Sequence, residues 1–108
     1  MKKVLGLVAI IVVTIVVAAI YYFYYYNSEV EQAKRECIKA CQLALQTGQN
    51  LSSGPCLSNS IINNWVCDVA HEPREPIDDL EENQCPAYLK TAQHFIEVDP
   101  NCNFIRAF

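Results

Sequence analysis

The fold of this chain is decided first by residues 4–26, which read VLGLVAIIVVTIVVAAIYYFYYY and contain no charge and no proline. As a helix with a rise of about 1.5 Å per residue, this stretch would be roughly 35 Å long, enough to cross the roughly 30 Å hydrocarbon core of a bilayer. The consecutive aromatic residues at 21–26 would surround the helix, as in the aromatic belt at a membrane surface. The sequence therefore predicts a single transmembrane helix within a membrane segment of residues 1–26.

Two forms of processing are alternatives to an uncleaved span. The two lysines ahead of the apolar run also fit a removable signal peptide, with small residues at 17–19 before a conceivable cleavage ahead of Ile20. A leader cleaved after Gly6 is a third alternative, although valine and leucine stand where a charge would be expected before that glycine. Because the run is longer than the roughly 7 to 15 residues of a signal-peptide core, an uncleaved signal anchor is favoured.

The basic residues near the span and the cysteines together indicate which side the rest of the chain faces. Lys2 and Lys3 abut the span, whereas Lys34, Arg35 and Lys39 lie a helical turn or more beyond it, so the positive-inside rule alone barely decides. All six cysteines follow the span, and an even number of cysteines in a short domain of this kind is typical of an oxidising compartment. We therefore expect a single-pass protein of the cell membrane with a cytoplasmic N-terminus and an extracytoplasmic domain.

Residues 27–108 have room for one small domain with a marginal core. A domain of this size buries only around 60% of its unfolded surface, so covalent staples would stabilise it. It holds six Lys or Arg residues against twelve Asp or Glu residues, a net charge near −6. Such a surface is a poor match for a phosphate backbone, which excludes nucleic acid as an expected partner. The expected partners are the lipid bilayer and either another envelope protein or a cation.

Residues 27–47 predict a helix that carries two of the cysteines. Apolar residues recur there every three or four positions and would form one buried stripe, made of Val30, Ala33, Cys37, Cys41 and Leu45. Residues four apart on a helix are about 5 to 6 Å apart at Cβ, more than the roughly 3.8 Å of a disulfide. Cys37 and Cys41 should therefore pair with different partners.

The cysteine spacing favours structural disulfides. It lacks the paired C-x2-C motifs of a zinc ribbon and the redox C-x-x-C motif. We expect three disulfides, with the connectivity left open, among Cys37, Cys41, Cys56, Cys67, Cys85 and Cys102.

The rest of the domain predicts strands separated by loops. Residues 49–60 are rich in Ser, Asn, Gly and Pro and predict an irregular loop, in which Asn50 is a candidate glycosylation site of the N-x-S type. Trp65–Val69 predicts a short strand, and residues 71–84 predict a long acidic loop with one helical turn around Asp79. The two final stretches, 94–98 and 103–107, predict a hairpin. The expected fold class is α+β, with the helix, short strand, long loop and hairpin following the membrane segment.

Residues of the acidic loop, together with Asp68 of the strand before it, form a candidate polar or cation site. Its members are Asp68, His71, Arg74, Asp78, Asp79, Glu81 and Glu82. Carboxylate oxygens suit calcium, although no EF-hand spacing is present. Cys67 beside His71 also permits a zinc site or a thiol nucleophile with a histidine base, although so small a domain leaves little room for an enzyme cleft. The simpler interpretation is that Arg74 pairs with neighbouring carboxylates and holds the loop.

Two stretches resemble a group of small, membrane-anchored, cysteine-rich archaeal proteins without an assigned activity. They are GPCLSNSIINNWVCDVAHEPREPIDDLEENQC at 54–85 and HFIEVDPNC at 94–102. Together these stretches span residues 54–102, about half of the chain. The resemblance implies a surface location and an archaeal membrane, and it carries over no catalytic residue.

The features above predict a membrane-anchored, disulfide-stabilised binding or structural module of the cell envelope. No cofactor is expected, and an enzyme is the less favoured class. The alternative is a small membrane-tethered enzyme or a metal-dependent protein, using calcium or zinc, centred on Asp68, His71 and Arg74.

Overall fold

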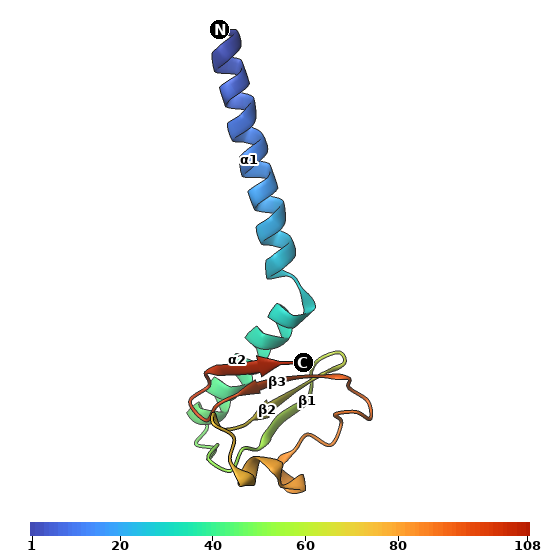
Figure 1. Cartoon of the computed structure of the whole chain (residues 1–108). Coiled ribbons are helices and arrows are strands. Elements are labelled where there is room, and N and C mark those ends of the chain that lie inside the picture. Colours follow the sequence, from blue (N-terminus) through green and yellow to red (C-terminus); the bar gives the residue numbers. More distant parts are fainter. The chain divides into compact units, whose positions relative to one another are not determined.

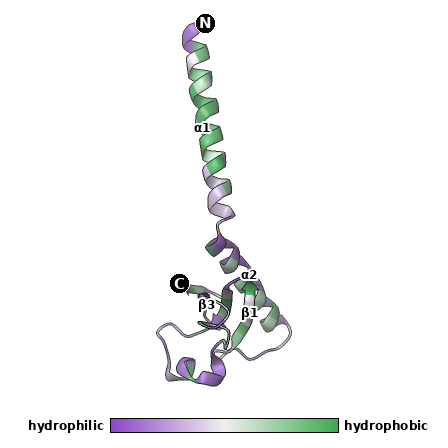
Figure 2. Ribbon diagram, turned by 90° about the vertical axis from the view of Figure 1, so that its right-hand side faces the viewer, coloured by the Kyte–Doolittle hydropathy of each residue, from purple (hydrophilic) through white to green (hydrophobic).

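The computed structural model describes residues 1–108, which divide into two compact units, Met1–Glu31 and Gln32–Phe108. The first unit consists mainly of helix α1 (Lys2–Tyr26), which is apolar along most of its length (Figure 2). None of its side chains is buried by the chain, and its length and composition are sufficient to cross a membrane. The predicted apolar helix is confirmed.

Asn27 ends α1 and separates it from the next helix. Its backbone N–H and its Nδ2 both donate to the carbonyl oxygen of Phe23, at 3.0 and 2.9 Å. A side-chain amide that satisfies a terminal carbonyl replaces the next helical N–H, so the helix does not need to continue. The chain restarts as α2 (Glu29–Gln46), so the helix predicted over residues 27–47 is confirmed, and it is an element separate from α1.

The buried face of α2 differs from the predicted stripe at both ends. Its buried residues are Ala33, Cys37, Cys41 and Ala44, whereas Val30 and Leu45 are 37% and 44% exposed. A helix turns about 100° per residue, so Ala44 falls at the centre of the stripe and Leu45 at its margin. Val30 lies in the N-terminal unit, outside the core of the domain. The core therefore uses the middle of the predicted stripe.

The second unit contains a four-stranded sheet in the order β1-β2-β3-β4 (Figure 1). The strands are β1 (Cys56–Ile62), β2 (Trp65–Val69), β3 (His94–Val98) and β4 (Phe104–Ala107). The outer pairs are antiparallel, and the central pair β2 and β3 is parallel. The predicted strand, the predicted C-terminal hairpin and the α+β class are confirmed.

The prediction of an irregular loop over residues 49–60 is wrong from Cys56 onward, where β1 begins. This strand lies at the edge of the sheet, and its register with β2 shifts on both sides of Ser58. An edge strand tolerates polar residues because one of its sides has no partner strand. Pairing with the apolar β2 therefore outweighs the local preference of a Ser- and Asn-rich sequence for turns.

Side chains along β2 and β3 point alternately to the two faces of the sheet, and each face packs against a different cluster. Trp65, Cys67 and Val69 share one core with the buried face of α2 and with Ile96 and Val98 of β3. On the opposite face, a smaller cluster joins Val66 to Cys85 and Ala92, which come from the long connection between β2 and β3. The connection covers part of this second face, and the candidate site lies beside the covered part.

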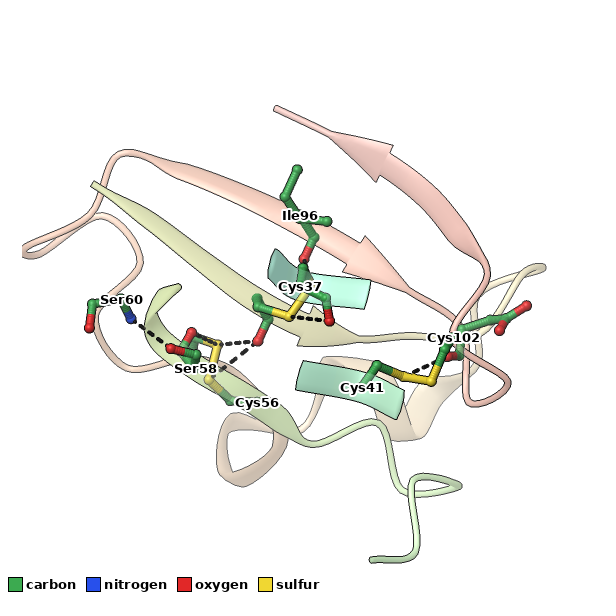
Figure 3. The surroundings of a disulfide bond; sticks show 10 residues. Cys37, Cys41, Cys56, Ser58, Ser60, Ile96 and Cys102 are labelled. Atoms are coloured by element: carbon green, nitrogen blue, oxygen red, sulfur yellow. Dashed lines mark hydrogen bonds between the residues drawn. A yellow bond between two sulfur atoms is a disulfide. The ribbon is translucent and has the colours of Figure 1, made fainter. Parts of the chain in front are cut away.

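Three disulfides hold the domain together, and no cysteine is free. Cys37 is bonded to Cys67 and Cys41 to Cys102, so two successive turns of α2 are joined to β2 and to the β3–β4 turn (Figure 3). The third disulfide, Cys56–Cys85, joins β1 to the long connection. The predictions of three disulfides and of separate partners for the two helical cysteines are confirmed.

The long connection of residues 70–93 contains two short 3-10 helices, Pro76–Asp79 and Glu81–Asn83. It loops out from the sheet between the yellow end of β2 and the red-brown start of β3 in Figure 1. The single helical turn predicted around Asp79 is therefore present and is followed by a second one. The turn between β3 and β4 is organised by Asp99, whose carboxylate accepts hydrogen bonds from the backbone N–H groups of Asn101 and Asn103.

Candidate functional site

Three charged or polar residues form a row across β2, β3 and β4 on the face of the sheet opposite α2. The parallel register of β2 and β3 places Asp68 beside Glu97, and the antiparallel register of β3 and β4 places Arg106 on the other side of Glu97. Neighbouring strands are about 4.8 Å apart, so adjacent members of this row are within side-chain reach. Because Cys67 and Ile96 point into the main core, strand alternation directs Asp68 and Glu97 to the other face.

Glu97 is the centre of this row and is bound on both sides. Its side chain is almost wholly inaccessible, with the residue only 7% exposed. Arg74 Nη1 donates to Glu97 Oε1 at 3.4 Å, and Arg106 Nε donates to Glu97 Oε2 at 3.0 Å. A buried carboxylate with two guanidinium partners keeps its charge compensated, so Glu97 fixes the positions of both arginines.

Asp68, unlike Glu97, has a carboxyl oxygen without a partner. Its Oδ1 is buried and has no hydrogen-bond partner. Burial, and then the negative charge of Glu97, raise the pKa of Asp68 from 3.8 to about 8, against a smaller lowering by the Val69 backbone N–H and by Arg74. Asp68 is therefore a neutral carboxylic acid at neutral pH, with a proton to donate and a free acceptor.

These residues line a cavity of about 490 Å³. One part of its wall is polar and is formed by Asp68, Arg74, Gln84, Glu97 and Arg106. The other part is apolar or aromatic and is formed by Cys85, Tyr88, Leu89 and Phe95. A concave site of a few hundred Å³ that combines apolar walls with a few polar groups is the usual form of a small-molecule site. A residue with a strongly perturbed pKa in such a cavity is a candidate for function.

The aromatic wall is held in place by ring contacts. Tyr88 meets Phe95 edge to face, with ring centroids 5.2 Å apart, and Phe108 stacks on Phe95 at 5.9 Å. Such pairs contribute about 0.5–1.5 kcal/mol beyond the area they bury. The cavity wall is therefore built by the fold and does not depend on a ligand to assemble it.

The candidate polar site expected from the sequence is divided among different environments. Asp68 and Arg74 line the cavity described above, whereas His71 and Arg74 line a second hollow of about 390 Å³ beside Asp99. Glu81 and Glu82 lie away from both, on a third hollow beside Pro86. The sequence predicted one site around Asp68, His71 and Arg74. In the structure, Asp68 and His71 line two different hollows, and Arg74 lines both.

Asp78 and His71 lock the long connection. Asp78 is only 2% exposed and accepts hydrogen bonds from the backbone N–H groups of His71 and Glu75, both at 2.9 Å, while His71 Nδ1 lies 2.9 Å from Asp78 Oδ1. Burial alone would raise the pKa of Asp78, but the bonds from Glu75 and His71 lower it below its usual value. Asp79 accepts a hydrogen bond from Arg74 Nε at 2.8 Å. These two aspartates hold the loop, as the simpler interpretation of the sequence expected for Arg74.

The metal and thiol hypotheses lack support in this geometry. No group of three or more His, Cys, Asp or Glu residues is placed to hold a metal ion. Cys67 is bonded to Cys37, which removes the thiolate that both the zinc hypothesis and the cysteine–histidine hypothesis required. The calcium hypothesis for the acidic loop stays a prediction.

Sequence reasoning missed Glu97, Arg106 and Tyr88. Glu97 carried a signal, because a charged residue stood in the middle of a predicted apolar strand on the face away from His94, Ile96 and Val98. The parallel pairing that brings Glu97 beside Asp68 had no local signal, since it joins strands separated by the long connection.

Asn50 is exposed, and its Oδ1 accepts hydrogen bonds from the backbone N–H and the Oγ of Ser52 at 3.0 and 2.7 Å. The sequon therefore lies on the surface in a local turn, and its glycosylation stays a prediction.

Comparisons with known proteins give no relative: no family model, no curated protein and no solved structure matches this chain. The resemblance to archaeal membrane proteins stays a prediction.

Proposed function

We propose that this chain is a membrane-anchored binding module that presents a small-molecule pocket outside the cell. In this proposal α1 spans the cell membrane with its N-terminus in the cytoplasm, and the disulfide-bonded domain faces the oxidising side. The resemblance noted in the sequence adds an archaeal membrane to the proposal. The pocket is the cavity lined by Asp68, Glu97 and Arg106.

Three observations support the location and the orientation. All the apolar side chains of α1 are exposed within the chain, and a helix that is apolar all round is suited to lipid. All six cysteines are oxidised in pairs, which is typical of proteins outside the reducing cytoplasm. Lys2 and Lys3, directly ahead of the apolar run, support a cytoplasmic N-terminus.

The observation that carries the binding function is the buried Oδ1 of Asp68, which has no hydrogen-bond partner although it lies in a pre-formed cavity. Glu97, on the adjacent strand, has two such partners. Leaving a buried polar atom unsatisfied costs about 1–3 kcal/mol, so a structural role alone would be better served by an apolar residue. A ligand that reaches Asp68 would recover this cost on binding.

The binding function is tested on the full chain in nanodiscs of zwitterionic lipid, with a set of small anionic, neutral and cationic compounds detected by NMR. Gln84→Trp places a large side chain at the cavity wall, and Gln93→Trp places the same side chain on an exposed position that does not line the cavity. We expect at least one compound to bind the wild type and Gln93→Trp but not Gln84→Trp. Absence of any binder sensitive to Gln84→Trp would remove the binding proposal.

A second candidate function is acid–base catalysis at the same cavity. It is favoured by one observation, the neutral carboxylic acid of Asp68 beside the doubly paired carboxylate of Glu97. A neutral carboxylic acid that lines a cavity can act as a general acid, and a second carboxyl group beside it is a candidate partner in proton transfer. Turnover of a bound compound that is lost in both Asp68→Asn and Glu97→Gln would favour this candidate, and binding without turnover would favour the first.

A further inference from the structure

The free side of Arg106 is the most informative feature of the cavity. Its Nε is used by Glu97 Oε2 at 3.0 Å, while its two terminal Nη atoms have no partner within the chain. Its side chain is 46% exposed, so the outer edge of the guanidinium is accessible. By contrast, Arg74 uses Nε, Nη1 and Nη2 on Asp79, Glu97 and the Asp78 carbonyl. Of its five N–H donors, Arg106 therefore has four left for a ligand, including both Nη groups in full, whereas Arg74 has one left on each Nη.

The free edge of a guanidinium is well suited to bind a carboxylate. Its two parallel N–H groups match the two oxygens of a carboxylate, and such charge-assisted pairs are roughly twice as strong as neutral hydrogen bonds. Glu97 already holds the other edge, so the guanidinium is fixed in orientation before a ligand arrives. Pre-organisation of this kind reduces the entropy cost of binding.

The apolar walls of the cavity limit the kind of group that the ligand can carry besides its anion. Tyr88, Leu89 and Cys85 line the apolar part of the cavity, together with Phe95, whose ring already contacts Tyr88 and Phe108. A compact apolar group attached to the anion fits this wall, and the cavity volume of about 490 Å³ is that of a small molecule.

We propose that the cavity binds the carboxylate of a small organic acid, anchored on the free Nη edge of Arg106 with its apolar part against Tyr88 and Leu89. This inference rests on the binding function proposed above and names its ligand class. The domain has a net charge near −6, so the anion is recognised against the overall charge of the domain, at the Nη edge of Arg106.

Asp68 makes this binding dependent on pH. The charged and titratable groups around it are Glu97 on β3, Arg74 and Asp78 on the long connection, and Arg106 on β4 beyond Glu97. While Asp68 is neutral, it can donate its proton to the ligand and does not repel it. Above about pH 8 a second carboxylate charge appears beside Glu97, and an anion is disfavoured. Affinity should therefore be retained below pH 8 and lost as the pH rises above it.

The test uses the full chain in zwitterionic nanodiscs, with benzoate and cyclohexanecarboxylate as probes and benzamide and benzylamine as their neutral and cationic counterparts. Affinity is measured by calorimetry and NMR from pH 6 to 9.5. We expect the carboxylates to bind about tenfold or more tightly than benzamide at pH 6.5, since a charge-assisted pair is lost in the amide. We also expect their dissociation constant to rise by up to about tenfold per pH unit above pH 8, as one proton becomes linked to binding.

Three variants separate the contributions of the two side chains. Arg106→Gln should abolish carboxylate binding at every pH, whereas Lys39→Gln removes an equal charge from α2, outside the cavity, and should bind like the wild type. Asp68→Asn should keep binding and lose its pH dependence. The chemical shifts of residues outside the cavity report whether each variant is folded.

Several outcomes would overturn the inference. They are equal affinity for benzoate and benzamide, tighter binding of benzylamine, carboxylate binding that survives Arg106→Gln, or a pH dependence that persists in Asp68→Asn. If a neutral or cationic compound binds and is displaced by Gln84→Trp, the ligand class is wrong while the binding function stands. If no compound of any charge binds, both fail.

Discussion

At the scale of single residues, Asp68 and Asp99 are two aspartates with opposite effects on stability. Asp68 is half-buried, its Oδ1 is buried without a hydrogen-bond partner, and its pKa is raised to about 8. Asp99 accepts bonds from the backbone of Asn101 and Asn103 and from the Asn103 side chain, and these outweigh the effect of burial and lower its pKa. One aspartate holds its proton in the folded state, and the other releases it more readily than in the unfolded chain.

Asp68→Asn should stabilise the domain at neutral and higher pH. Between about pH 4 and pH 8 the unfolded chain has released the Asp68 proton while the folded chain still holds it, so the free energy of unfolding of the wild type falls as the pH rises through this window. The variant lacks this loss and should gain on the order of 2 kcal/mol at pH 8, less than the full shift implies because Asp68 keeps some solvent contact. Urea unfolding followed by the fluorescence of Trp65, the single tryptophan, measures the difference.

Asp99→Asn is the matched opposite case. Because the pKa of Asp99 is lowered, its contribution to stability is present above the unfolded value of 3.8 and disappears as the pH falls through the lower folded value. The variant should lose about 1 kcal/mol at pH 7 and show no loss in strong acid. If both variants shifted stability in the same direction at pH 7, the assignment of the two carboxyls would be wrong.

Gly54→Ala should be strongly destabilising, whereas Gly48→Ala should be mild. Both glycines have positive φ, +71° and +83°, which an alanine adopts at a cost of about 1 kcal/mol. At Gly54 the new Cβ would also lie 2.6 Å from Asp78 Oδ1 and 3.1 Å from the Val69 carbonyl oxygen, while at Gly48 nothing lies within 4 Å. We expect a total loss of about 2–4 kcal/mol at Gly54, since displacing the buried Asp78 also weakens its hydrogen bonds. Equal melting temperatures for the two variants would contradict this account.

At the scale of elements, each disulfide connects a different pair of segments of the domain. Cys37–Cys67 and Cys41–Cys102 attach α2 to the sheet and its turn, whereas Cys56–Cys85 attaches the long connection to β1 and contributes Cys85 to the cavity wall. Removing one disulfide from a small domain costs roughly 2–5 kcal/mol. The position of each disulfide decides which part of the domain loosens.

The double variant Cys56→Ala with Cys85→Ala should loosen the cavity selectively. Without this bond, residues 84–93 are held to β1 and the sheet by the small cluster of Val66, Ala92 and their neighbours. We expect hydrogen exchange of their backbone amides to accelerate by about tenfold or more, because local opening becomes easier. Cys41→Ala with Cys102→Ala serves as the control and should accelerate exchange at the end of α2 instead. Uniform acceleration in both variants would mean that the domain opens only as a whole.

The elements show what local sequence could and could not predict. The spacing of Cys37 and Cys41 on one helix face was enough to predict separate disulfide partners, and the apolar alternation of Trp65–Val69 was enough to place β2. The strand β1 was missed because its pairing with β2 comes from the tertiary structure, while its Ser and Asn residues locally favour turns. The cavity was half predicted: Asp68 and Arg74 were named, but Glu97 and Arg106 enter it only through the pairing of β3 with β2 and β4.

At the scale of the whole molecule, the chain combines an apolar helix with an acidic, oxidised domain. The first unit ends at Glu31, and the second, Gln32–Phe108, contains every disulfide and every strand. The two units are therefore suited to different surroundings, the first to lipid and the second to water. The proposed topology places the boundary between them at the outer surface of the membrane.

Trypsin added to intact cells should reach the domain if this topology is correct. Lys34 and Arg35 precede the first disulfide-bonded cysteine, so cleavage there would release residues 36–108 into the medium as a disulfide-bonded fragment. Mass spectrometry of the medium and of the membrane-bound remainder checks both products. A domain that is protected until the cells are lysed would reverse the orientation, and a mature N-terminus at Leu7 or Ile20 would remove the anchor.

The pattern of cystine links makes the domain tolerant of backbone nicks. Every peptide bond from Cys37 to Cys102 is spanned by either the Cys37–Cys67 or the Cys41–Cys102 link, so a single cut anywhere between these residues leaves the two pieces covalently continuous. A protease that nicks the long connection would therefore leave both pieces tethered to α1. A cut ahead of Cys37 would release the whole disulfide-bonded domain, and a cut after Cys102 would release only the C-terminal residues that include β4. Between these cysteines, a nick would shed a piece only if a reductant then opened the disulfides.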